Sequence, residues 1–162
     1  MHFFKTSYQS PLGKVHITCS DKALCALTFL EDDQSEEVTE TNNLTALACR
    51  QLDEYFTGTR TVFQIPIAQS GTPFQTKIWT LLQEIRYGKT RSYMDLSKRY
   101  GDVKAIRAVA AANGKNNVAI IIPCHRVIGT DRTLTGYAGG LWRKQWLLAH
   151  EAKYSNGVQE LF

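Results

Sequence analysis

Hydrophobic and polar side chains alternate in the first part of the chain. The alternation covers residues 3–8 and again residues 14–19, with Ser-Pro-Leu-Gly at positions 10–13 between them. A period of two is typical of half-buried strands, and a short segment with proline and glycine is typical of a connecting turn. These positions predict a β-hairpin, and the apolar run at 23–30 predicts a third strand.

The spacing of apolar residues changes to a helical repeat after these strands. Apolar residues recur every three or four positions over 44–56, and Gly58 predicts the end of that helix. Residues 61–71 lack this repeat and predict extended chain that finishes in a Ser-Gly pair. We place a domain boundary there, so that a sheet-plus-helix domain spans residues 1–70.

The second part of the chain predicts mainly helices. Thr72 followed by Pro73 is a favourable start, because the hydroxyl caps the first turn and proline fits the first helical position. Residues 92–100 and 103–113 predict two short helices across a Gly-Asp turn. This pattern indicates a helix-turn-helix, and an ordinary helical hairpin is the alternative. A last helix is predicted over 141–149, with apolar anchors at Leu141, Trp142, Trp146, Leu147 and Leu148.

One segment combines a buried apolar run with three reactive side chains. Residues 119–122 are alanine and isoleucine, Pro123 follows, and Cys124, His125 and Arg126 come next. An isoleucine-rich run stopped by proline predicts a buried strand that ends at a site. A thiol beside an imidazole and a guanidinium indicates an activated cysteine nucleophile. The alternative is a buried structural cysteine with its basic neighbours on the surface.

The composition fits a globular protein of one or two small domains. The chain has 162 residues, and 43% of them are hydrophobic, enough for an ordinary core. No apolar run approaches the length of a membrane span and the first residues lack the order of a signal peptide, so we expect a cytoplasmic protein. The cysteines show no CxxC spacing, although Cys19, Cys25 and His16 form one candidate metal set. The remaining two cysteines are Cys49 and Cys124.

Charge is distributed unevenly along the sequence. Residues 1–72 contain 5 lysines and arginines against 9 acidic residues, whereas residues 73–150 contain 13 against 4. The basic half includes both the cysteine segment and the predicted helix-turn-helix. Such a half indicates a polyanionic partner such as nucleic acid, and a merely solvated basic face is the alternative.

Several short motifs follow one another between residues 71 and 151. They are Gly71-Thr72-Pro73-Phe74-Gln75, Ser92-Tyr93, Ala105-Ile106-Arg107-Ala108-Val109, Asn116, Ile-Pro-Cys-His-Arg-Val-Ile-Gly at 122–129, Gly-Tyr-Ala-Gly-Gly at 136–140, and Trp146-Leu147-Leu148 before Glu151. This set resembles the O6-alkylguanine-DNA alkyltransferases, the methylated-DNA–protein-cysteine methyltransferases. Pattern and resemblance together predict an α/β (α+β) fold, with a sheet-plus-helix domain at 1–70 and a mainly helical, winged-helix-like domain with the helix-turn-helix at 71–162.

The resemblance implies catalytic roles by position. Cys124 resembles the acceptor of the alkyl group from O6 of guanine, and His125 resembles the general base that acts through a bound water. A water bridge suits the predicted strand, because consecutive side chains of extended chain point to opposite sides. Glu151 resembles the carboxylate that orients the histidine, and Asn116 the asparagine that braces the segment entering the active site. Tyr93 resembles the tyrosine near the extruded base, where its phenol can assist the leaving guanine.

The resemblance also implies how DNA and the lesion are held. The second helix of the helix-turn-helix resembles one that enters the minor groove, with Arg107 filling the gap left by the extruded nucleotide. Ala108 and Ala111 are small enough for close approach, and we expect Arg126 to contact DNA. The expected lesion pocket contains Tyr137, the backbone N–H of Ala138 as a donor to guanine O6, the backbone carbonyls of Cys124 and Val127, and Asn113 at its approach.

The implied partner is double-stranded DNA that carries alkylated guanine, with O4-alkylthymine as a further candidate substrate. The implied reaction is a single irreversible transfer by a monomer, without a metal or organic cofactor. Cys124 separates the chain from a related non-catalytic class that usually has tryptophan there, and Asn117 departs from the proline of many relatives. A lesion-binding protein without transfer activity and a cysteine hydrolase of peptides or esters are the alternatives.

Overall fold

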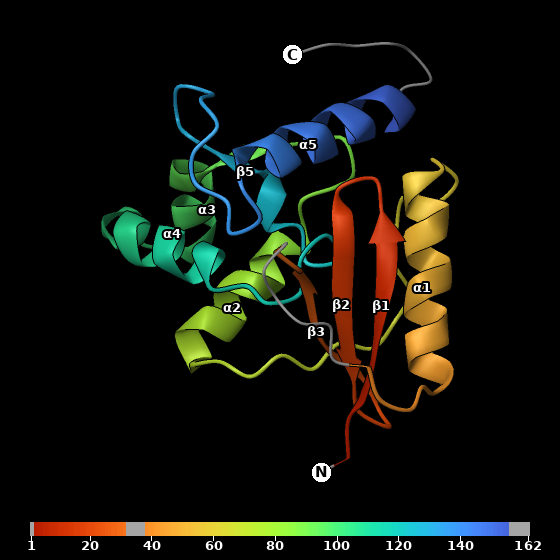
Figure 1. Cartoon of the computed structure of the whole chain (residues 1–162). Helices are drawn as coiled ribbons and strands as arrows, with labels where there is room; N and C mark the ends of the chain where they lie inside the picture. The colour runs from red at the N-terminus through yellow and green to blue at the C-terminus, as the bar shows by residue number, and fades with distance from the viewer. Residues whose placement is uncertain (1, 32–37, 156–162) are drawn as a thin grey trace. The chain divides into compact units, whose positions relative to one another are not determined.

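A three-stranded antiparallel sheet forms the centre of the first part of the chain (Figure 1). Its strands β1 (Phe4–Ser10), β2 (Gly13–Cys19) and β3 (Leu24–Phe29) lie in the order β1-β2-β3. A tight turn joins β1 to β2, and Gly13 has a φ of 104°, which glycine adopts without strain. The predicted hairpin and third strand are therefore confirmed.

The computed structural model describes residues 2–31 and 38–155. The chain divides into two units, the first made of Met1–Ser70 and Asn117–Ala119 and the second of Gly71–Asn116 and Ile120–Phe162. Residues 156–162, which the predicted second domain includes, lie outside the described residues. The short return to the first unit adds Val118 beside Leu27 of β3 as a parallel bridge.

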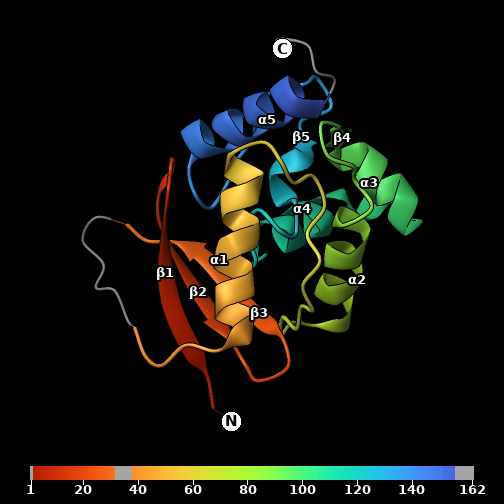
Figure 2. The ribbon, with the colours of Figure 1, turned by 90° about the vertical axis from the view of Figure 1, so that its right-hand side faces the viewer.

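Helix α1 (Asn43–Phe56) covers one face of the sheet in the first unit, as Figure 2 shows. It begins with a capping box, in which Asn42 accepts a hydrogen bond from the Thr45 backbone and the Thr45 side chain accepts one in return. Leu52 and Tyr55 are fully buried, as are the sheet residues that face inward. The apolar face of the helix is thus what holds it to the sheet.

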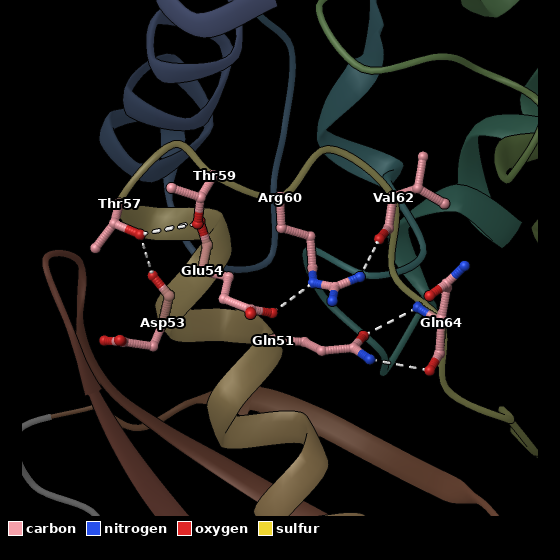
Figure 3. Close-up of polar contacts among 8 residues, drawn as sticks. All are labelled: Gln51, Asp53, Glu54, Thr57, Thr59, Arg60, Val62 and Gln64. Carbon is pink, nitrogen blue, oxygen red and sulfur yellow. Dashed lines mark hydrogen bonds and ion pairs between the residues drawn. The ribbon is translucent and has the colours of Figure 1, made fainter.

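The segment after α1 is fastened back onto that helix by side chains (Figure 3). Gln51 donates to the Gln64 carbonyl at 3.0 Å and accepts from the Gln64 N–H at 2.9 Å. Arg60 donates to Glu54 at 2.8 Å and to the Val62 carbonyl at 2.7 Å. These bonds satisfy the polar groups of an extended segment that has few ladder partners of its own.

The predicted helix-turn-helix is present in the second unit. α2 (Pro73–Leu82) precedes it, and α3 (Tyr93–Tyr100) and α4 (Ile106–Gly114) lie side by side (Figures 1 and 2). Gly101 ends α3 with a left-handed φ of 109°. The second helix starts later than predicted, because Val103–Ala105 form a 3₁₀ turn capped by the preceding aspartate.

The final helix, α5 (Leu141–Ser155), departs from prediction in length and in its buried face. It continues beyond residue 149, since no glycine or proline interrupts the sequence there. Leu147 and Leu148 are buried as expected, but Leu141 and Trp142 are 48% and 56% exposed. The next two residues of the helix, Arg143 and Lys144, are buried instead.

The predicted strand at 119–122 is wrong. Ala119 forms one backbone bond to β3, and the following residues turn, with Ile120 at a φ of 71°. Ile120 and Ile122 are buried all the same, at 1% and 2% exposure. A run of buried apolar residues does not distinguish a strand from a buried turn whose backbone groups find partners elsewhere. The Ile122 carbonyl finds two such partners, the Asn116 side chain at 2.9 Å and the Cys124 N–H at 2.8 Å.

Candidate active site

Cys124, His125 and Arg126 form a single 3₁₀ turn in the second unit, η2 (Cys124–Arg126), rather than extended chain. The turn leads into β5 (Val127–Ile128), which pairs in parallel with β4 (Arg91–Ser92). All three side chains are buried, with exposures of 6%, 0% and 7%. The alternative, in which the basic neighbours of the cysteine lie on the surface, does not hold.

The thiol of Cys124 lies in contact with Asn116. The Asn116 amide donates to Sγ at 3.2 Å while also holding the Ile122 carbonyl, and Asn113 donates to the Cys124 carbonyl at 3.4 Å. Burial raises the pKa of the thiol, and the bond from Asn116 and the charge of Lys144 lower it by less. The resting group is therefore a thiol, and a nucleophilic thiolate requires a base.

His125 is joined to Glu151 on α5, and both side chains are almost completely buried. Nε2 of the histidine lies 2.7 Å from Oε2 of the carboxylate. Because an ionised carboxylate only accepts hydrogen bonds, Nε2 carries the proton and Nδ1 is left as an acceptor. Nδ1 is buried and has no hydrogen-bond partner among the described residues.

Burial lowers the pKa of His125, and Arg126 and Lys144 lower it further, although Glu151 acts in the opposite sense. Burial also opposes ionisation of Glu151, but His125 and Arg126 together hold the pKa of that carboxyl below its ordinary range. The pair therefore rests as a neutral imidazole beside a carboxylate. This is the state in which the imidazole can accept a proton.

These pKa shifts predict a loss of stability in acid. The pKa of His125 is held below 6.5 in the folded chain. As the pH drops below 6.5, the unfolded chain therefore binds a proton at this histidine before the folded chain does, and the folded state loses stability. Stability from Glu151, whose pKa is held below 4.5, is fully present above pH 4.5 and is lost below it. We expect the urea midpoint to fall between about pH 7.5 and about pH 5.5, and to fall less in His125→Gln. Equal slopes in the two proteins would contradict a neutral His125.

Lys144 is a site residue that the sequence reasoning missed. Its side chain is fully buried, and its ammonium donates to the Thr135 carbonyl at 3.1 Å. Burial lowers the pKa of Lys144 to about 8, and the proximity of Cys124 raises it. Helical periodicity predicts that apolar residues form the buried face of α5, so it does not predict a buried lysine. The one sequence feature that marks this position is the pair of cations, Arg143 and Lys144, shortly after Gly139-Gly140.

The loop at 129–140 carries two of the expected pocket residues, Tyr137 and Ala138. Thr135 donates from its hydroxyl to the Tyr93 hydroxyl at 3.1 Å, so the loop is tied to the start of α3. Burial raises the pKa of Tyr137 far above its ordinary value, and the neighbouring Cys124 adds to this. Ala138 is exposed and Val127 is fully buried. Tyr137 thus lies near Cys124, and Tyr93 is joined to the same loop through Thr135.

Helix α4 exposes one arginine among small residues. Arg107, Ala108 and Ala111 are exposed, whereas Val109 and Ala112 face the interior. A hollow of about 870 Å³ lies elsewhere in this unit, between α2 and α3, and none of the expected pocket residues lines it. Its cationic lining residues are Arg86, Lys89, Arg91, Lys98 and Arg99.

In residues 2–31 and 38–155, no three histidine, cysteine or acidic side chains are grouped so that they could hold a metal ion, and the candidate set at His16 finds no support. Within the same residues, no helix has the length and apolar character needed to cross a membrane.

The fold and the site define a helix-turn-helix protein with a buried cysteine beside a His–Glu pair. The chain matches the 6-O-methylguanine DNA methyltransferase models, the ribonuclease-like domain over residues 3–69 and the DNA-binding domain over residues 73–153. The chain therefore belongs to the methylated-DNA–protein-cysteine methyltransferase family, a family of DNA-repair enzymes.

Individual relatives agree with this assignment over most of the chain. The constitutive methylated-DNA–protein-cysteine methyltransferase of Bacillus subtilis is 44% identical over 147 residues, covering 86% of this chain and 88% of the relative. The corresponding protein of Mycolicibacterium paratuberculosis is 44% identical over 158 residues, covering 94% of each. The crystal structure of Mycobacterium tuberculosis OGT in complex with DNA has a TM-score of 0.84 and 39% identity, covering 95% of this chain and 94% of that one.

Proposed function

We propose that the chain transfers the alkyl group of O6-alkylguanine in duplex DNA to Sγ of Cys124, once per molecule. The observation that carries this proposal is a buried thiol held by Asn116 in the same turn as a neutral histidine that is fixed by Glu151. A suitable base and an oriented thiol are what nucleophilic displacement at the alkyl carbon requires. The thioether formed has no route back to the thiol in this site.

The proposed reaction transfers one alkyl group, and proton donors or acceptors act at both ends of that transfer. Nδ1 of His125 accepts the Cys124 proton through a bridging water, the thiolate forms the C–S bond, and the C–O bond to guanine breaks. The electron pair of that bond leaves with guanine, which accepts a proton or a hydrogen bond from the Tyr93 phenol. If Tyr93 gives up its proton, the proton taken up by His125 replaces it through solvent. The N–H of Ala138 and the carbonyls of Cys124 and Val127 bind the base edge.

The proposed DNA surface is α4. Its exposed alanines allow the helix to approach a groove closely, and Arg107 next to them can occupy the space of an extruded nucleotide. Backbone contacts dominate such binding, because repair requires no sequence preference. We also propose a monomer that acts in the cytoplasm, where the four free cysteines stay reduced.

The test is the intact mass of the protein after it is mixed with duplex DNA that contains a single O6-methylguanine. We expect the mass to increase by one methyl group per chain and the yield to stop at one equivalent. Binding without a mass change would move the protein to the lesion-binding class. Product formation beyond one equivalent would instead indicate a hydrolase that turns over.

Arg107→Ala tests the proposed role in extrusion. The variant should lose roughly 10- to 100-fold in transfer from duplex DNA, because the cost of unstacking, a few kcal/mol, is no longer offset. Its reaction with free O6-benzylguanine should be unchanged, since a free base needs no extrusion. Lys77→Ala, which changes another cation of this unit, serves as the control for charge. Equal losses on the two substrates would remove Arg107 from this role.

A further inference from the structure

Arg126 is enclosed by the active site instead of facing a DNA surface. Its guanidinium donates from Nε to Oε1 of Glu151 at 2.7 Å and from Nη2 to Oε2 at 3.0 Å. Nη1 donates to the Ile85 carbonyl at 2.7 Å, just beyond the end of α2. With 7% of the residue exposed, these donors are directed at the interior. The expected DNA contact therefore has no support in this geometry.

The second oxygen of Glu151 is shared between two donors. Oε2 lies 2.7 Å from Nε2 of His125 and 3.0 Å from Nη2 of Arg126, so the arginine fork fixes the plane in which the carboxylate meets the imidazole. The Ile85 carbonyl anchors the fork from a separate element. The orientation of His125 thus depends on Arg126 through Glu151.

A buried carboxylate requires a positive partner, and this site offers two. If His125 were the only partner, it would rest as imidazolium and could not accept the thiol proton. A guanidinium group keeps its charge in proteins, so Arg126 can neutralise Glu151 without a proton from His125.

We infer that Arg126 is a positioning residue for the transfer reaction, which fixes Glu151 against His125 and supplies the permanent charge that leaves His125 neutral. This inference rests on the proposed role of His125 as the base. The low pKa of His125 agrees with it, since Arg126 is one of its causes after burial. Other titratable or charged side chains that interact with His125, Glu151 or Arg126 include Lys144, Tyr87 and Tyr137.

The test compares Arg126→Met and Arg126→Lys with the wild-type protein. Four quantities are measured: affinity for undamaged duplex, transfer rate from O6-methylguanine duplex, transfer rate from free O6-benzylguanine, and the imidazole titration of His125 by ¹⁵N NMR. Arg99→Met is the matched control, because it removes an exposed arginine from an ion pair with Glu84 at 3.1 Å. That control should match the wild type in both transfer rates and in the titration.

We expect the affinity of Arg126→Met for undamaged DNA to stay within about twofold of the wild-type affinity. Both transfer rates should fall by roughly 10- to 100-fold, because a misplaced base loses part of the rate that a positioned base contributes. His125 should take up its proton at a higher pH in this variant, because Glu151 then has no other counter-charge. Arg126→Lys should keep the wild-type titration, since the charge remains, but recover only part of the rate, since the fork is lost.

The opposite pattern would overturn the inference. In that pattern, Arg126→Met loses DNA affinity, and this loss accounts for its slower transfer from duplex, while free-base transfer and the His125 titration stay unchanged. Arg126 would then be a DNA contact. If Arg126→Met does not fold, Arg126→Lys decides between the two patterns, because it keeps the buried charge. A failure of the proposed base is recognised separately: His125→Phe would then transfer at the wild-type rate, whatever the Arg126 variants do.

Discussion

Cys124→Ser should abolish alkyl transfer while DNA binding is retained. The change replaces one atom, so the bond that Asn116 makes and the burial of the turn can persist. A serine hydroxyl is a weak nucleophile at its ordinary pKa. The reaction is a displacement at an alkyl carbon, so it lacks the acyl group at which serine nucleophiles paired with a histidine usually react. We therefore expect no methylated protein in the intact mass after prolonged incubation with O6-methylguanine duplex.

Cys25→Ser is the matched control for this prediction. Cys25 is half-buried on β3, in the first unit, and its thiol donates to the Ala23 carbonyl at 3.7 Å. The control should gain one methyl group like the wild type. If Cys124→Ser also gained one, the acceptor would be another residue, and peptide mapping of the methylated protein would identify it.

The elements of the fold could be predicted where the spacing of apolar residues matches the period of a strand or a helix. Alternation gave the hairpin, and helical spacing with Thr72 and Gly101 at helix ends gave α2 and α3. The 119–122 segment shows the limit of this reasoning. Its isoleucines are buried by a turn, and one of the two bonds that the Ile122 carbonyl accepts comes from the side chain of Asn116, which no periodicity reveals.

The chemistry of the site was predictable in part. The adjacent Cys124 and His125 are visible in the sequence, and the resemblance pointed to Glu151, 26 positions further on. The buried cations were not predicted, because arginine and lysine are rarely interior unless they are paired. Arg126 is interior because Glu151 lies opposite it, and Lys144 because the Thr135 carbonyl accepts a hydrogen bond from its ammonium. Both partners are supplied by tertiary structure.

Glu151→Gln should reduce both transfer and stability more than any other conservative change in the His–Glu–Arg cluster. The amide is nearly isosteric, but it cannot neutralise Arg126, and breaking a buried pair in this way costs about 3–5 kcal/mol. The amide can also offer an N–H to Nε2 of His125, which would move the imidazole proton to Nδ1 and remove the acceptor. We expect transfer to fall by about 10²–10⁴-fold, the range that a general base contributes.

Glu84→Gln provides the contrast, because it removes the same charge from an exposed ion pair with Arg99 and should cost less than about 1 kcal/mol. Urea unfolding of the wild type and the two variants measures the stability difference, and single-turnover kinetics with O6-methylguanine duplex measures transfer.

The double variant Glu151→Gln with Arg126→Met tests whether the two residues act as one unit. If they do, its loss of transfer rate should be far smaller than the sum of the two separate losses. Strictly additive losses would mean that Arg126 acts independently of the carboxylate, and a wild-type rate in Glu151→Gln would mean that His125 needs no carboxylate to hold its proton at Nε2.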